Sequence, residues 1–202
     1  MEKLDLRKEL GALYRPSSSR PSLVDVPRLS VLAVDGAGNP NTSAAFRDAI
    51  QALYPLVYTI KFTMKKAETG DFSVMPLEAL WWNRPDGTLD PADRAEWKWT
   101  AMIVVPDLVT RNEVEAARRA VAAKKAPTSL SQVSLRTFDE GRAAQLLHVG
   151  PYSAEEPTIR TMLAFIAKEG LQARGSHHEI YLSDPNRTAP EKLKTIVRQP
   201  VT

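Results

Sequence analysis

The stretch with the clearest chemical potential runs from His177 to Leu182 and is closed by the breakers Asp184-Pro185. Its aromatic and β-branched content predicts a half-buried strand. Alternating side chains then place an imidazole, a carboxylate and a phenol on one face: His177, Glu179 and Tyr181. A carboxylate between apolar neighbours is costly to bury without a partner. Glu179 is therefore either a functional acid or an ordinary polar residue on an exposed face.

A second group of residues could surround that acid with flat rings. All four tryptophans lie in one region: Trp81, Trp82, Trp97 and Trp99. Adjacent residues on a strand face opposite sides, so Trp81 and Trp82 must diverge, whereas Trp97 and Trp99 share a face. Most buried tryptophans serve core packing. The alternative is an aromatic-walled pocket for small molecules.

An aromatic wall with one carboxylate has a defined chemistry. Flat hydrophobic molecules stack on the rings, and cations gain cation–π attraction as well as the charge of Glu179. Low polarity around Glu179 is expected to raise its pKa, so that it could protonate an oxygen or, ionised, take a proton from water. Tyr152 and Tyr181 could hydrogen-bond the ligand or the water.

Other kinds of catalytic site fit this sequence poorly. A zinc site would need His177, His178 and Glu179, but His178 points to the other face of the strand. A Ser-His-Asp triad would need a G-x-S-x-G turn, which the sequence lacks. The chain has no cysteine, which excludes thiol nucleophiles, disulfides and iron–sulfur clusters. We expect no metal and no cofactor.

Composition limits the partners. The 202 residues carry 27 basic and 24 acidic side chains, a net charge of +3 that is too balanced to argue for nucleic acid. The start of the chain lacks the apolar core of a signal peptide, and no apolar run approaches the length of a membrane helix. We expect a cytoplasmic protein without nucleic-acid or membrane partners, either a monomer or a weak homodimer.

Several elements can be placed from the first part of the chain. Residues 1–14 read as an amphipathic leader helix, followed by a Ser/Pro-rich linker to about residue 22. A helix begins near Ala44, capped by Thr42 or Ser43, and Pro55 is expected to end or kink it. The run 57–62 fits either a strand or a continued helix. Strands are predicted over 73–82 and 97–105.

The second part continues the pattern. A capping box at Thr110 and Glu113 predicts a connecting helix over about 111–125, and Ser153 with Glu156 predicts another helix start. Residues 132–138 and 142–149 read as paired strands. The last segment, 195–201, reads as an edge strand.

The two halves of the chain match each other. In each half a strand, a glycine turn, a helix and a strand that bears a glutamate follow in order, with Glu78 and Glu179 in corresponding places. We predict an α+β fold made of a duplicated βαββ-type repeat, with pseudo-two-fold symmetry and antiparallel sheets. Repeat one spans about 23–106 and repeat two about 130–202. A ligand cleft between the repeats is expected.

These residues resemble a known family, the GyrI-like small-molecule-binding domains. The resemblance covers nearly the whole chain from about Leu4. It rests on the matching segments 75–82, 96–99, 148–152 and 177–185, and residues 189–201 fit as well. It implies paired βαββ units holding a ligand between them, with Glu179 as the central acid. Pro55 departs from the relatives, which favour an uninterrupted helix there.

The resemblance also implies a more specific activity. Stand-alone members with a double tryptophan resemble a subgroup that hydrolyses cyclopropane-bearing, DNA-alkylating compounds inside an aromatic cage. The tryptophan-rich strands of this chain fit that subgroup. On that basis Glu179 and Tyr152 are the expected catalytic residues. The expected ligand-binding residues are Trp81, Trp82, Trp99, Tyr54, Tyr58, Tyr181 and His177.

Two other functions stay open. The same pocket would serve a protein that binds or sequesters xenobiotics without turnover. An inhibitor of a DNA topoisomerase, by analogy with the family's name, is a further reading. The short leader leaves no room for the helix-turn-helix found in drug-sensing relatives, so we do not expect a transcription factor.

Overall fold

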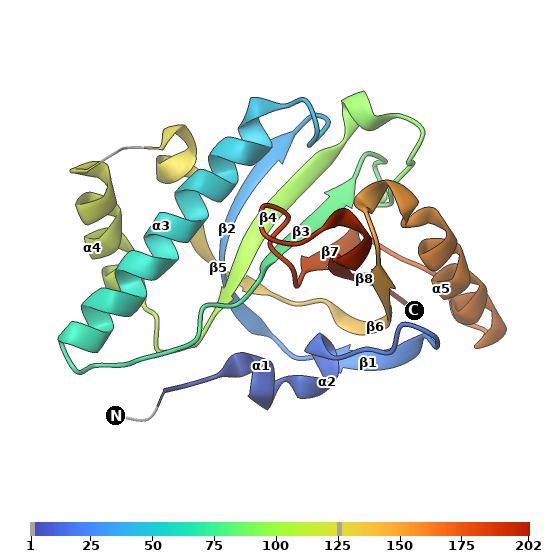
Figure 1. The fold of residues 1–202 in the computed structure, drawn as a ribbon, viewed down its shortest axis with the longest axis horizontal. Coiled ribbons are helices and arrows are strands. Elements are labelled where there is room, and N and C mark those ends of the chain that lie inside the picture. The colour runs from blue at the N-terminus through green and yellow to red at the C-terminus, as the bar shows by residue number, and fades with distance from the viewer. Residues whose placement is uncertain (1–2, 125–126) are drawn as a thin grey trace.

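The computed structural model describes residues 3–124 and 127–202 and has a mixed helix and strand architecture (Figure 1). One antiparallel sheet of eight strands runs in the order β1-β6-β8-β7-β3-β4-β2-β5. The strands are β1 Ser22–Val26, β2 Leu29–Ala37, β3 Leu77–Trp82, β4 Lys98–Val105, β5 Ser134–Phe138, β6 Gly141–Val149, β7 His177–Tyr181 and β8 Lys194–Pro200. The prediction of an α+β fold with antiparallel strands is confirmed, but the strands form one continuous sheet.

Helices cover both faces of the sheet, with α3 and α5 on one face and α2 on the other. They are α1 Leu6–Glu9, α2 Gly11–Tyr14, α3 Ala44–Lys66, α4 Arg111–Ala122 and α5 Glu156–Lys168. Short 3-10 turns lie at η1 Arg94–Glu96, η2 Thr128–Gln132, η3 Tyr152–Ala154 and η4 Pro190–Lys192. Helix α3 packs on β2 and β4, whereas α5 packs on β6, so the two helices lie over different halves of the sheet (Figure 1). No helix in the described part of the chain is both long enough and apolar enough to cross a bilayer.

Helix α3 corrects the expectation for Pro55. The helix starts where Ser43 accepts a hydrogen bond from the Ala45 N–H at 3.2 Å, and it continues through Pro55 to Lys66. Proline removes one helical hydrogen bond, but a buried apolar stripe runs along both sides of it, including Leu53 and Val57. That stripe keeps the helix continuous, and the run 57–62 is helix and not strand.

Five predicted elements differ from the prediction in their partners, number or ends. The leader predicted as one helix contains two short helices, α1 and α2, and the connecting helix α4 has its capping box but ends at Ala122. The predicted pair β5 and β6 does not pair, because β5 joins β2 and β6 joins β1 and β8. The predicted edge strand β8 is an inner strand between β6 and β7, with Pro200 at its end.

On the sheet face opposite α3 and α5 lies a buried polar network. The His178 ring contacts Glu78 at 3.0 Å and Glu140 at 2.9 Å, and Glu140 also pairs with Arg198 at 3.2 Å. Burial alone would lower the pKa of His178, but the two carboxylates raise it to about 9. The network therefore holds a protonated histidine between two carboxylates, one from β3 and one from the loop between β5 and β6.

The N-terminal segment closes this network. The Tyr14 hydroxyl donates to Glu78 at 2.7 Å, while Arg198 donates to the Leu13 carbonyl at 2.8 Å. Leu13 and Tyr14 are themselves buried. Residues 12–14 are thus fixed to the sheet by both apolar packing and hydrogen bonds from the strands.

Candidate functional site

The two central strands bring the predicted acid and the tryptophans to one face. In the register of β3 and β7, Trp81 lies opposite His177 and Ala79 lies opposite Glu179. Paired residues share a face of the sheet, so Glu179 and Trp81 lie on the same side. Phe46 of α3 packs on the Trp81 ring with centroids 5.1 Å apart, which identifies this side as the face that α3 covers.

Glu179 is held by its neighbours on β7. The Tyr181 hydroxyl donates to Glu179 Oε2 at 2.6 Å, and His177 Nε2 lies 3.5 Å from Oε1. The Glu179 side chain keeps 15% of its surface exposed, so the carboxylate is not sealed off from solvent. Burial pushes its pKa up, but the His177 and Tyr181 contacts outweigh that and hold the pKa of Glu179 below the usual glutamate range. The expected raised pKa at Glu179 is therefore wrong.

The raised pKa that was expected at Glu179 belongs to a second carboxyl group, that of Glu155. It lies at the start of α5, is 6% exposed, and is in hydrogen-bond contact with Glu179. Burial, and then the negative charge of Glu179, raise the pKa of Glu155 to about 9. Two carboxylates in contact cannot both ionise easily, which favours one proton on the pair, with the higher pKa at Glu155.

Unsatisfied polar atoms mark the same place. Among the described residues, five buried side-chain atoms lack a hydrogen-bond partner: Trp81 Nε1, Trp99 Nε1, Glu155 Oε1, His177 Nε2 and Thr195 Oγ1. The strand register places all four of the sheet residues on the Glu179 face. Three of these atoms belong to groups that contact the carboxyl pair or form part of it, since His177 lies 3.5 Å from Glu179 and Thr195 lies against Glu155.

Three further segments border the site. Tyr152, in the turn before α5, packs edge-on against Tyr181 with ring centroids 5.7 Å apart, and it is 41% exposed. Burial, followed by the charges of Glu155 and Glu179, raises the pKa of Tyr152 to about 12, which keeps its hydroxyl protonated as a donor. The loop after β7 carries Asp184, whose charge reaches both Tyr152 and Tyr54 of α3. This loop lies between α3 and α5 (Figure 1).

Comparison with known proteins identifies the family. Residues 19–202 match the protein family described as the GyrI-like small molecule binding domain. The chain belongs to the GyrI-like family. A search of curated proteins gives no match.

Solved structures agree with this assignment. An uncharacterized conserved protein from Listeria innocua is 40% identical to this GyrI-like chain, over 99% of this chain and 100% of that chain, with a TM-score of 0.91. A hydrolase encoded by lin2189 of the same organism is 39% identical over 100% of both chains, with a TM-score of 0.87. The EcmrR C-terminal domain, 13% identical over 91% of this chain and 97% of that chain, shares the fold at a TM-score of 0.58.

Within this GyrI-like domain the predicted aromatic residues separate into groups. Trp81 and Trp99 are buried on the Glu179 face, and Trp99 fits because it lies over Gly36, where a Cβ would come within 2.1 Å of the ring. Trp82 is corrected: its register places it on the opposite face from Glu179, since it follows Trp81 directly. Trp97 was not among the predicted ligand residues, yet its ring lies 5.6 Å from that of Trp81.

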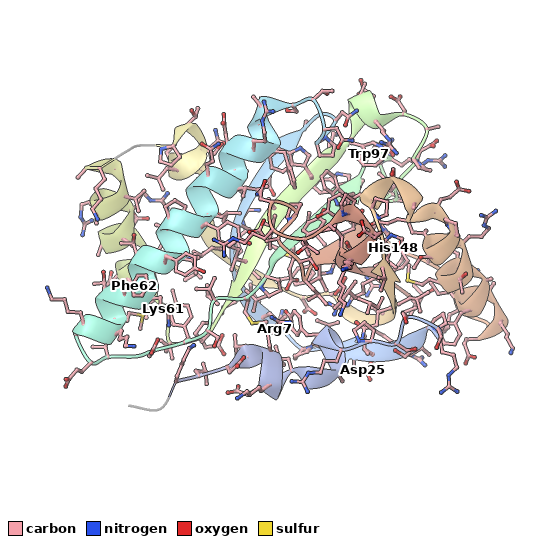
Figure 2. All side chains as sticks on the ribbon, in the orientation of Figure 1. Arg7, Asp25, Lys61, Phe62, Trp97 and His148 are labelled. Carbon is pink, nitrogen blue, oxygen red and sulfur yellow. The ribbon has the colours of Figure 1, made fainter. Side chains whose placement is uncertain are left out.

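The two tyrosines of α3 lie farther out. Tyr54 and Tyr58 stack on each other with centroids 6.4 Å apart, and Tyr58 is 43% exposed. Tyr58 lines a surface hollow between α3 and α4, together with Phe62 and Val121. Figure 2 shows Phe62 on the part of α3 remote from His148 and Trp97. Tyr54, which is reached by the charge of Asp184, therefore lies nearer the Glu179 site, and Tyr58 lies one turn farther along α3 in the hollow beside α4.

Sequence reasoning missed Glu155. The predicted capping box of Ser153 and Glu156 does not form, because residues 152–154 make a 3-10 turn and α5 begins at Glu156 with Glu155 as its N-cap. That shift turns Glu155 inward and leaves the Glu156 side chain 84% exposed. A glutamate one position before the expected helix start carries no signal in the sequence that separates it from its neighbour.

The site has no metal-binding geometry. Across residues 3–124 and 127–202, no group of three or more His, Asp or Glu side chains could hold a metal ion. His178, which would complete a zinc set with His177 and Glu179, is committed to the network on the other face. The carboxyl groups of Glu155 and Glu179 and the phenols of Tyr152 and Tyr181 are groups that donate and accept protons.

Proposed function

We propose that this GyrI-like protein binds flat aromatic xenobiotics beside Glu179 and hydrolyses reactive cyclopropane-bearing, DNA-alkylating compounds. The observation that carries the proposal is the contact between Glu155 and Glu179 beside Tyr181, two carboxyl groups whose pKa values are shifted in opposite directions. Such a pair supplies an acid and a base at one point. The 39% identity to a Listeria innocua hydrolase over the full chain supports hydrolysis as the reaction type.

The proposed substrate is a spirocyclopropyl dienone. Glu179 takes a proton from water, whose oxygen forms a bond to a cyclopropane carbon. The strained carbon–carbon bond breaks, and its electron pair moves into the ring, which becomes an aromatic phenol. Glu155 donates the proton that the dienone oxygen needs. The product is substrate plus water, so no oxidant or cofactor is required.

The pair resets itself after each turnover. Glu179 ends protonated and Glu155 ionised, and their direct hydrogen-bond contact lets the proton return. Tyr181 orients Glu179, and Tyr152 offers an exposed phenol for the ligand. Because the strained substrate is already activated, positioning supplies much of the required catalysis. Trp81, Tyr54 and Trp97 are the proposed walls.

We also propose that the two halves descend from one duplicated unit with a pseudo-two-fold axis between them. In the sheet, the neighbours β2, β4 and β3 of the first half correspond to β6, β8 and β7 of the second. Strands β3 and β7 meet at the centre, and α3 and α5 follow corresponding strands. On this proposal the ligand lies at the seam between residues of about 23–106 and of about 130–202.

Replacing Glu179 tests the proposal. With the simplest spirocyclopropyl cyclohexadienone as substrate, we expect Glu179→Gln to reduce kcat by about a hundredfold or more while leaving KM for this neutral substrate little changed. Phenol formation, followed by absorbance and identified by mass, is the measurement. Glu156→Gln removes an exposed neighbouring carboxylate and is the matched control.

The main alternative is a protein that binds xenobiotics without turnover. The net negative charge of the carboxyl pair beside aromatic rings favours it for cationic ligands. It would show itself as tight binding of cations with no phenol formed, and as loss of affinity in Glu179→Gln. Wild-type protein that binds the dienone but forms no phenol above the background rate would contradict the hydrolase.

A further inference from the structure

A second hollow, with a volume of about 750 Å³, lies on the sheet face opposite Glu179. Its lining residue Leu147 of β6 pairs with Ile196 of β8, and Ile196 pairs with Ile180 of β7. Ile180 in turn pairs with Glu78 of β3. Paired residues share a face of the sheet, so Leu147 lies on the Glu78 face. The hollow is therefore separate from the candidate site, and its occupant does not depend on the proposed function.

The floor of this hollow is apolar. Leu147 and Val149 contribute to it from β6, Leu182 from the end of β7, and Tyr14 from α2. The Tyr14 hydroxyl is already bonded to Glu78, so this residue offers its ring. Leu147 and Leu182 are half-buried, and Val149 keeps 47% of its surface exposed. Open apolar surface in a recess is a place for an apolar ligand group.

The rim of the hollow is basic. Arg7 of α1 (labelled in Figure 2), Lys192 of η4 and Lys194 of β8 line it, and all three are exposed. Glu191 is the one acidic residue in the lining, which leaves an excess of positive charge. Among residues 3–124 and 127–202, none of the three basic side chains forms a salt bridge. They are free to pair with an anion.

Basic groups around an apolar floor select a ligand with two parts. A carboxylate would accept charge-assisted hydrogen bonds from the rim, and an apolar chain would cover the floor. The floor is less exposed than the rim at Tyr14, Leu147 and Leu182. A chain reaches these side chains only by entering the recess, which favours a free molecule over the flat surface of a bilayer. The volume also lies within the range of roughly 300–1,000 Å³ that is typical of small-molecule pockets.

We propose that this hollow binds a free, single-chain amphipathic carboxylate of the medium-chain fatty acid class. The carboxylate lies among Arg7, Lys192 and Lys194, and the chain lies on Leu147 and Val149. Because α1 and α2 supply part of the lining, the bound molecule joins the N-terminal segment to the end of the sheet. This binding is non-covalent and involves no reaction.

The test is calorimetric titration of the full chain with decanoate near neutral pH, where the ligand is ionised. We expect saturable binding at one site, with an affinity that falls as salt screens the rim. Decanol has a chain of the same length without the charge, and it should bind at least about tenfold more weakly, as loss of a charge-assisted contact predicts.

Matched variants locate the site. Val149→Glu places a carboxylate on the floor at an exposed position and should weaken decanoate binding by about tenfold or more. Leu163→Glu makes the same kind of change at a 43% exposed position on α5 and should bind as wild type. Lys192→Gln should weaken binding by about three- to fivefold, whereas Lys168→Gln, at the end of α5, should not. Circular dichroism checks each fold, and the lysine pair decides if Val149→Glu unfolds.

Four results would overturn the proposal. They are no saturable decanoate binding, equal affinity for decanol, wild-type affinity in folded Val149→Glu, and wild-type affinity in Lys192→Gln. Binding to phosphatidylglycerol vesicles without binding of free decanoate would assign the patch to a membrane surface and would also overturn it. Phenol formation from the dienone reports on the other face of the sheet, so failure of this inference and failure of the proposed function are seen separately.

Discussion

At the scale of single residues, the site depends on which carboxyl group holds the proton. The sequence indicated Glu179 as the functional acid and correctly put Trp81 and Trp82 on opposite faces, because strand alternation is a local property. It assigned the raised pKa to Glu179. That error arose because the competing group, Glu155, arrives from a different element and is separated by 24 residues in the chain.

The pH dependence of turnover follows from this pair. The proposed reaction needs Glu179 ionised and Glu155 protonated. The pKa of Glu179 is lowered, so activity should be lost only below the ordinary glutamate range. The pKa of Glu155 is raised to about 9, so activity should fall again as the pH rises through that value. We expect a bell with a broad plateau around neutrality, whose limbs belong to the coupled pair.

The profile of kcat/KM for the dienone, from about pH 4 to about pH 10, measures both limbs. In Glu155→Gln the alkaline limb should disappear along with most of the activity, whereas Glu156→Gln should keep both. A rate that rises steadily through pH 9, or an alkaline limb that survives in Glu155→Gln, would contradict the assignment of the proton to Glu155.

At the scale of elements, local sequence signals predicted the presence of helices and strands better than the pairing between strands. The capping box of α4 and the strand at His177 to Tyr181 are where the sequence predicts them. Helix α3 runs on through Pro55 because burial of its apolar stripe outweighs one lost hydrogen bond. The pairing of β5 with β2, and not with β6, depends on long-range contacts that no short window contains.

The N-terminal segment shows the same limit. Residues 1–18 precede the matched family region, and their sequence suggests only an amphipathic leader. Yet Tyr14 and Glu78, 64 positions apart, share a buried hydrogen bond that ties α2 to the centre of the sheet. Helix α2 is therefore part of the folded domain and lies on the sheet face that carries Glu78.

Removing one hydroxyl tests that docking. Tyr14→Phe keeps the ring but leaves a buried carboxylate oxygen of Glu78 without its donor. We expect the free energy of unfolding to fall by about 1–3 kcal/mol, measured by urea denaturation. Tyr58→Phe, at a 43% exposed ring on the outside of α3, is the control and should change stability by less than about 0.5 kcal/mol. Equal effects of the two substitutions would show that the Tyr14 hydroxyl does not anchor the segment.

At the scale of the whole molecule, the site is a product of assembly. Glu179 comes from a central strand of the sheet, Glu155 from the start of α5, Trp81 from β3 and Tyr54 from α3. The sequence predicted an acid beside aromatic rings at the seam between two similar halves. It could not predict the meeting of β3 and β7, on which that seam depends, because strand register is set by the packing of the complete sheet.

Ligands are expected to bind beside the Glu155–Glu179 pair, between α3 and α5. The most direct test is a crystal structure of Glu179→Gln with the spirocyclopropyl cyclohexadienone bound, since this variant should hold the substrate without opening it. We predict the dienone oxygen within hydrogen-bond distance of Glu155 and the ring against Trp81 or Tyr152. A ligand seated instead in the hollow between α3 and α4, beside Tyr58 and Phe62, with no contact to either carboxyl position, would contradict the claim.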